Sequence, residues 1–341
     1  MFPRLAMVCF VTISASWQAA AWDYEGHQAI NHLALASLPK NFPSFALTPA
    51  ARDRIAFLSG EPDRWRNTPD LSLQQNNAPD HYIDLEQLKD YDLNPQNLPV
   101  LRYDFVGGLA VFRSGHPDKF PVADPTKDLA HTRNLIGFLP WTITEYTARL
   151  KSAFSYLKTY QTAGGTPAEI ENAQANIIYL MGVMGHFVGD GSQPLHTTLH
   201  FNGWVGANPQ HYTTEHSFHS WIDGGYFRAT GGLKHSTMFE KIRPAERVGN
   251  ALLSDGVFRA VIGYLSEQNK LVEPLYQLEK DGKLSGDGEK GLVGRTALEA
   301  QLVRAGQMLG DIWLTSWQDA SPDTYLERAL ALQRIRKTGT K

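Results

Sequence analysis

Apolar residues recur at helical spacing through most of the 341-residue chain, and alternating runs of β-branched residues are scarce. This pattern predicts an all-α fold. A first helix is expected over 24–38. The pattern of 128–160 is helical with Pro140 inside it, which predicts a kink or a break near Leu139. The polar stretch 59–79 and the glycine-rich, charged stretch 281–290 are expected to be loops. Further helices are expected over 51–58, 215–227, 244–268, 296–318 and 322–336.

The segment 168–189 is predicted to be a buried helix at the centre of the fold. Its apolar residues fall on one stripe, and few charged residues follow Glu171. The last turn carries His186, and Asp190 follows four residues later. Because residues four apart leave the same face of a helix, both side chains can reach one site.

The first 21 residues have the pattern of a secretory signal peptide. Arg4 precedes a short apolar stretch, and three alanines end at Ala21, directly before Trp22. We expect cleavage between Ala21 and Trp22 and a secreted or periplasmic protein, with 22–341 forming a single all-α domain; an uncleaved anchor is the alternative. No later segment has eighteen consecutive apolar residues, so a transmembrane protein is not expected.

Charge and cysteine content narrow the chemistry. The formal net charge is -3, which excludes a generic polyanion-binding protein, so any phosphate contact must come from a local feature. The only cysteine, Cys9, lies inside the expected signal peptide, so the mature chain would have neither a disulfide nor a thiolate ligand. Twelve histidines remain as metal ligands.

The strongest motif runs from His186 through Asp190 and Pro194 to His196. We expect Pro194 to end the central helix, so that His196 approaches from a loop and binds a second metal ion, with Asp190 as a bridge. The alternative is a buried helix end with hydrogen-bonded polar residues. Two histidines and a carboxylate converging at the end of an apolar helix favour the metal site.

Two overlapping pairs compete for a further metal site. His219 and Asp223 are four residues apart, and so are His211 and Glu215. Periodicity alone does not choose between these pairs, and at least one of them must be an ordinary surface pair.

The amino-terminal part of the chain offers further candidate ligands. Asp63 and His81 flank the polar stretch 59–79, although a helix cap and a structural histidine are their ordinary roles. His27 lies five residues after Trp22. A free α-amine titrates near neutral pH and is a good zinc donor, so cleavage before Trp22 would create a ligand.

These residues resemble the zinc-dependent single-strand nucleases of the S-one/P-one type, which share a fold with bacterial zinc-dependent phospholipase C. The resemblance covers 22–223 and rests on the motif His-x-x-x-Asp-x-x-x-Pro-Leu-His at 186–196 together with Trp22. It implies a helical domain of the phospholipase C/P-one nuclease type with three zinc ions. The lack of cysteine after cleavage departs from the family, whose nucleases usually carry disulfides, and suggests a bacterial member.

The resemblance also implies which residues bind each ion. One zinc ion would take Asp63, His81, His186 and Asp190; another would take the amine and carbonyl of Trp22, with His27 and Asp190; the third would take His196, His219 and Asp223. Three dications would lower the pKa of a bound water and neutralise phosphate oxygens without a lysine cluster. Asp63 would also orient or deprotonate the attacking water, and Arg66 is a candidate phosphate contact, although a solvated surface arginine is its ordinary role.

Three functions compete at this stage. The leading hypothesis is an endonuclease or nucleotidase that acts on single-stranded RNA or DNA. A phospholipase C acting on phosphocholine lipids is the alternative, and it would favour the His211 and Glu215 pair. A structural or buffering zinc protein is disfavoured because structural zinc sites are usually closed by four protein ligands.

Overall fold

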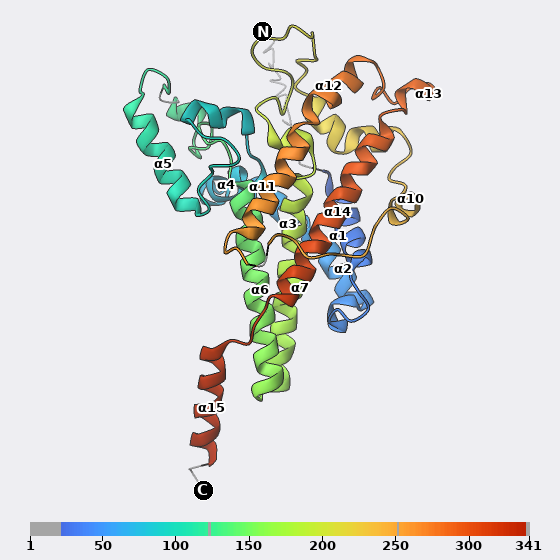
Figure 1. The fold of residues 1–341 in the computed structure, drawn as a ribbon. Coiled ribbons are helices and arrows are strands. Elements are labelled where there is room, and N and C mark those ends of the chain that lie inside the picture. The colour runs from blue at the N-terminus through green and yellow to red at the C-terminus, as the bar shows by residue number, and fades with distance from the viewer. Residues whose placement is uncertain (1–21, 122–123, 251, 339–341) are drawn as a thin grey trace, which may run out of the picture.

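The computed structural model describes residues 22–121, 124–250 and 252–338, which form α-helices and short helical turns joined by loops (Figure 1). The predicted all-α fold is confirmed. Within the described ranges, β-structure is limited to two isolated bridges, one of which pairs Ile83 with Gly137. No helix in these ranges is long and apolar enough to cross a membrane. The expected signal peptide, 1–21, lies outside the described residues.

The helices follow one another along the chain with several short 3-10 turns between them. The α-helices before residue 200 are α1 (Tyr24–Ser37), α2 (Pro49–Leu58), α3 (Glu61–Arg66), α4 (Leu71–Asn77), α5 (Arg102–Gly115), α6 (Leu139–Ala163) and α7 (Pro167–Asp190). Those after it are α8 (Phe218–Ser220), α9 (Tyr226–Ala229), α10 (His235–Phe239), α11 (Gly256–Asn269), α12 (Val272–Lys280), α13 (Gly288–Gly291), α14 (Arg295–Gln318) and α15 (Thr324–Thr338). A π-helical turn, η6 (Trp221–Gly225), joins α8 to α9, and the 3-10 turns are η1 (Ser44–Leu47), η2 (Ala78–His81), η3 (Leu85–Tyr91), η4 (Pro125–Lys127) and η5 (Pro194–Thr197).

Helices α6 and α7 form a long antiparallel pair through the middle of the molecule, beside α1 and α14 (Figure 1). Gly164 ends α6 in the left-handed region, at φ 90°. Thr166 and Glu169 then form a capping box that starts α7. This turn sets the direction of α7, whose last three turns are entirely buried.

Helix α1 approaches the end of α7 closely because α7 has glycines on the facing side. A Cβ atom at Gly185 would lie 1.7 Å from Oδ1 of Asn31, and one at Gly189 would lie 2.9 Å from Nδ1 of His27. The side-chain amide of Asn31 donates hydrogen bonds to the carbonyls of Ile55 and Gly182, which ties α1 to α2 and α7. The glycines therefore allow a side chain of α1 to reach the last turn of α7.

Several sequence predictions hold and others need correction. Helices were correctly expected near α1, α2, α7, α14 and α15. The predicted loop 59–79 is wrong because that stretch contains α3, α4 and the start of η2. The helix expected over 128–160 begins only at Leu139, so the break predicted near Leu139 is confirmed, whereas 128–138 is not helical. Pro140 lies in the first turn of α6, where a missing N–H leaves no hydrogen bond unmade.

The helix predicted over 244–268 begins only at Gly256. Before it, the chain runs along α14 as an irregular strap. The backbone N–H groups of Arg243, Glu246 and Val248 donate to side chains of α14 that are spaced four residues apart, Gln307, Asp311 and Thr315. These tertiary hydrogen bonds satisfy the backbone that a helix would otherwise have satisfied. Helices α5 and α12 were not predicted.

Candidate metal centre

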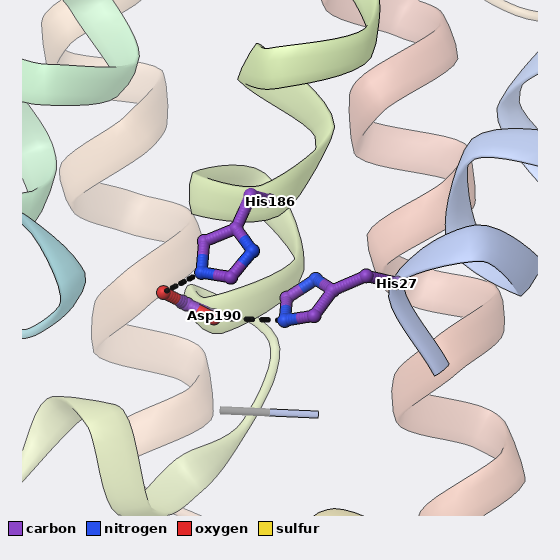
Figure 2. A group of neighbouring side chains, drawn as sticks. All are labelled: His27, His186 and Asp190. Carbon is purple, nitrogen blue, oxygen red and sulfur yellow. Dashed lines mark ion pairs between the residues drawn. The ribbon is translucent and has the colours of Figure 1, made fainter. Parts of the chain in front are cut away.

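Three groups of histidine and aspartate side chains meet where α7 ends. The first joins His27 of α1 to His186 and Asp190 of α7 (Figure 2). Nε2 of His27 lies 3.5 Å from Oδ1 of Asp190, and Nε2 of His186 lies 3.5 Å from Oδ2. The two imidazole rings stack with centroids 3.9 Å apart. Asp190 thus presents one oxygen to each histidine.

The second group contains Asp63, His81 and His186, so His186 belongs to both groups. Oδ1 of Asp63 lies 3.8 Å from Nε2 of His186, and Nδ1 of His81 lies 3.0 Å from the same nitrogen. Nδ1 of His81 is also 2.9 Å from Oδ2 of Asp190. All four residues of the first predicted site therefore lie together, and Asp190 lies between this group and His27.

The third group contains His196, His219 and Asp223. Nε2 of His219 lies 3.0 Å from Nε2 of His196 and 3.0 Å from Oδ2 of Asp223. His219 lies in α8 and Asp223 in the π-helical turn η6, a geometry that recurs at functional sites. The competing residues His211 and Glu215 are exposed and lie outside every group, so the structure supports the His219 and Asp223 pair.

His196 reaches the site from the 3-10 turn η5. Helix α7 ends at Asp190, before the predicted stop at Pro194, and Pro194 instead begins η5. The rigid proline at the first position of this turn places His196 beside the end of the helix. The predicted approach of His196 from outside the helix is confirmed, although Pro194 has a different role.

Backbone carbonyls orient three of the histidines. Nδ1 of His186 lies 2.7 Å from the carbonyl of Ser59, and Nδ1 of His196 lies 2.7 Å from the carbonyl of His81. Nδ1 of His219 lies 3.0 Å from the carbonyl of Phe201. Because a carbonyl oxygen only accepts, each Nδ1 carries a proton and each ring turns its Nε2 toward the centre, as metal-bound histidines do.

This arrangement fits a cation. Nε2 of His196 and Nε2 of His219 face each other at 3.0 Å, a distance that requires a proton or a metal ion between the two nitrogen atoms. Two nitrogen ligands of one tetrahedral zinc ion are about 3.3 Å apart, which is close to this distance. Both ring nitrogens of His27 and Nε2 of His81 are buried without a hydrogen-bond partner among the described residues. Burying such nitrogen atoms costs free energy unless a hydrogen-bond partner or a metal ion binds them.

Burial sets the protonation of the centre. It lowers the pKa of His186 to about 3, and it holds the pKa of His27, His81 and His196 well below the usual range, so these rings are neutral and able to bind a metal ion. Burial also raises the pKa of Asp190 well above its usual range. An ionised carboxylate at this depth needs a cation beside it, and a metal ion would supply one.

Trp22 lies against the end of α7. Its indole Nε1 donates to the carbonyl of Gly189 and to Oγ of Ser192, each at 3.1 Å, and the residue is fully buried. The next N–H, that of Asp23, donates to the carbonyl of Asp223 at 3.1 Å. Trp22 is therefore held close to both the first and the third groups, while coordination by its amine stays a prediction.

A cleft of about 370 Å³ opens beside the centre, and its lining includes His81, His196 and His219. Arg66 also lines it, paired with Asp63 at 2.8 Å. Sequence reasoning did not identify the other polar residues of the lining, which are Asp84, Gln87, Thr132 and Arg133. Asp84 lies three residues after His81, so its position near the site could have been found from the sequence. The residues of the loop 128–135 could not, because this loop is remote in sequence and carries no motif.

Comparison with known proteins adds no family assignment, since no protein-family model matches the chain and no curated protein does either. The site therefore rests on geometry: a group of buried donors able to hold metal ions, in an all-α protein.

Replacing His219 with alanine should remove one metal ion from the centre, because the third group would keep only His196 and Asp223. Replacing the exposed His211 with alanine is the matched control, and its metal content should equal that of the wild type. Elemental analysis of both variants measures the difference. Metal loss in the His211→Ala variant alone would show that the other pair forms the site.

Asp84 gives the protein a distinctive pH dependence. Burial, with a smaller effect of Glu86, raises its pKa to about 8. Between the unfolded pKa of 3.8 and this value, the folded state binds a proton that the unfolded state lacks, so stability falls as the pH rises through that window. The Asp84→Asn variant should gain melting temperature relative to wild type between about pH 5 and about pH 9. If the difference in melting temperature between Asp84→Asn and wild type were the same at about pH 5 and about pH 9, the raised pKa of Asp84 would be refuted.

Proposed function

We propose that the protein is a zinc-dependent phosphodiesterase that cuts single-stranded RNA or DNA, and that it belongs to the S-one/P-one nuclease family. The observation that carries the proposal is the position of Asp190, whose two oxygens face His27 on one side and His81 and His186 on the other. A shared carboxylate places adjoining metal ions within reach of one phosphate, an arrangement that suits diester hydrolysis.

The side chains of the centre have distinct roles in this proposal. Zinc ions bound here would lower the pKa of a water molecule and polarise the phosphate. Asp63 faces His186 and is paired with Arg66, which lines the cleft, and this position suits a carboxylate that orients the attacking water. Arg66 holds Asp63 in place through their 2.8 Å ion pair, and its guanidinium can also contact a phosphate oxygen in the cleft.

The lining of the cleft favours a nucleic-acid substrate over a phosphocholine lipid. A choline group binds best in a cage of aromatic rings without competing cations, whereas this cleft contains Arg66 and Arg133. Tyr82 and Phe201 are the aromatic residues of its lining, and Phe201 is half exposed. A flat ring of this kind can stack on a base, and the buried carboxyl group of Asp84 can hydrogen-bond to its edge.

The proposal is tested by comparing rates on different substrates. The zinc-loaded protein, processed before Trp22, is incubated with single-stranded DNA, RNA, duplex DNA and phosphatidylcholine vesicles. We expect cleavage of both single strands, with little cleavage of the duplex and no release of phosphocholine. Lipid turnover without nucleic-acid turnover would overturn the choice of substrate, and inactivity on all four would overturn the proposed enzyme class.

A further inference from the structure

The loop 128–135 contributes Thr132, Arg133 and Leu135 to the wall of the cleft. A buried carboxylate, that of Asp128, fixes its shape. Oδ1 of Asp128 accepts hydrogen bonds from the backbone N–H groups of Thr132, at 2.9 Å, and Arg133, at 3.3 Å. His131 lies in the left-handed region at φ 53°, and its N–H donates to the carbonyl of Asp128. The backbone at Arg133 is therefore set by the loop itself.

The same loop is fastened to the segment that carries His81. The hydroxyl of Tyr82 donates to the carbonyl of Leu135 at 3.1 Å, and the N–H of Asp84 donates to the carbonyl of Ile136 at 2.8 Å. An isolated β-bridge between Ile83 and Gly137 continues this contact. The backbone of Arg133 is thus held at a fixed position relative to His81, a ligand of the proposed metal centre.

The guanidinium of Arg133 makes no hydrogen bond or ion pair with the described residues, and the residue is exposed at the cleft. The pKa of the nearby Asp124 is lowered mainly by hydrogen bonds from Thr126, and Arg133 contributes least. Arg66, the other arginine of the cleft, is already paired with Asp63. In a chain with a formal net charge of -3, an exposed arginine that lines the cleft from a fixed backbone is suited to an anionic group of a substrate.

We propose that Arg133 binds a phosphate next to the one that is cut, so that the preferred substrate is a single-stranded oligonucleotide and not a mononucleotide. This inference rests on the proposed nuclease function. A cleft of about 370 Å³ is near the lower end of ordinary ligand sites and has room for about one nucleotide. The rest of a longer strand must leave the cleft. The exposed guanidinium of Arg133 lies where it can bind the sugar-phosphate backbone of that strand.

The test compares Arg133→Ala and Arg133→Lys with the wild type on a single-stranded decanucleotide and on bis(p-nitrophenyl) phosphate, which has only one phosphate. For Arg133→Ala we expect kcat/KM on the oligonucleotide to fall about 10- to 100-fold, mostly through KM. The small diester should be cut at the wild-type rate. The slope of log KM against log salt should decrease by about 0.7, the value for one phosphate contact on a single strand, and Arg133→Lys should keep most of that slope.

The control variant is Arg149→Ala, because Arg149 is an exposed arginine of α6 outside the cleft. It should match the wild type on both substrates. Equal losses of Arg133→Ala on both substrates, or no loss on the oligonucleotide, would overturn the inference while leaving the proposed nuclease in place. Equilibrium binding of a labelled decanucleotide measures the same contact without turnover. Unchanged binding in Arg133→Ala would overturn the inference even if the wild type proved inactive as a nuclease.

Discussion

Replacing Asp190 with asparagine should remove most of the bound metal and lower phosphodiesterase activity by about a thousandfold or more, as expected when metal stabilisation worth several kcal/mol is lost. Asp190 lies within 4.0 Å of four histidine rings, those of His27, His81, His186 and His196. An amide of the same shape has no negative charge, so it cannot hold two adjoining cations together. Metal content and turnover of the purified variant measure the effect.

The control for this prediction is Asp311→Asn. Asp311 is a partly buried carboxylate of α14 that accepts hydrogen bonds from Glu246 and Gln307, away from the centre. This variant should keep its metal and its activity, even if some stability is lost. An Asp190→Asn protein that folds and retains full metal content and turnover would contradict the bridging role of the carboxylate.

Retaining one extra alanine before Trp22 should lower activity by about a hundredfold or more while leaving the fold intact, as expected for the loss of a metal ligand. The backbone here cannot slide to compensate. The indole of Trp22 is fixed on Gly189 and Ser192, and the N–H of Asp23 is bound to Asp223. An added residue therefore moves the α-amine away and puts an amide nitrogen, which is a poor donor, in its place.

A chain extended by one alanine after Lys341 is the matched control, because it has the same added mass at the other end. Circular dichroism and melting temperature should be the same for both extended chains, and only the amino-terminal extension should lose turnover and bound metal. Wild-type rates in the amino-terminal variant would remove Trp22 from the ligand set.

The sequence was most informative where one local pattern settled both structure and chemistry. Helix α7 combines a long apolar stripe with the pair His186 and Asp190 at its end, so its position and the convergence of these two side chains could both be predicted. The i, i+4 spacing of His219 and Asp223 also brought those two residues together, but the same spacing in His211 and Glu215 did not. Only tertiary packing, which buries the first pair and exposes the second, separates them.

Other features depend on contacts that periodicity cannot show. The close approach of His27 depends on Gly185 and Gly189 facing α1, and no spacing rule predicts which helix will use such a surface. The segment 243–248 had a helical pattern but is bound as a strap by side chains of α14. Arg133 enters the cleft through a loop whose shape comes from hydrogen bonds to Asp128.

We propose that buried histidines and aspartates at the end of α7 hold adjoining zinc ions. Anomalous X-ray scattering at the zinc edge, measured on crystals of the processed protein, tests it directly. We predict three anomalous peaks, one at each of the three groups, with Asp190 between the first two. The absence of any peak near Asp190, or a single peak at a distant surface site, would show that these residues do not form a zinc centre.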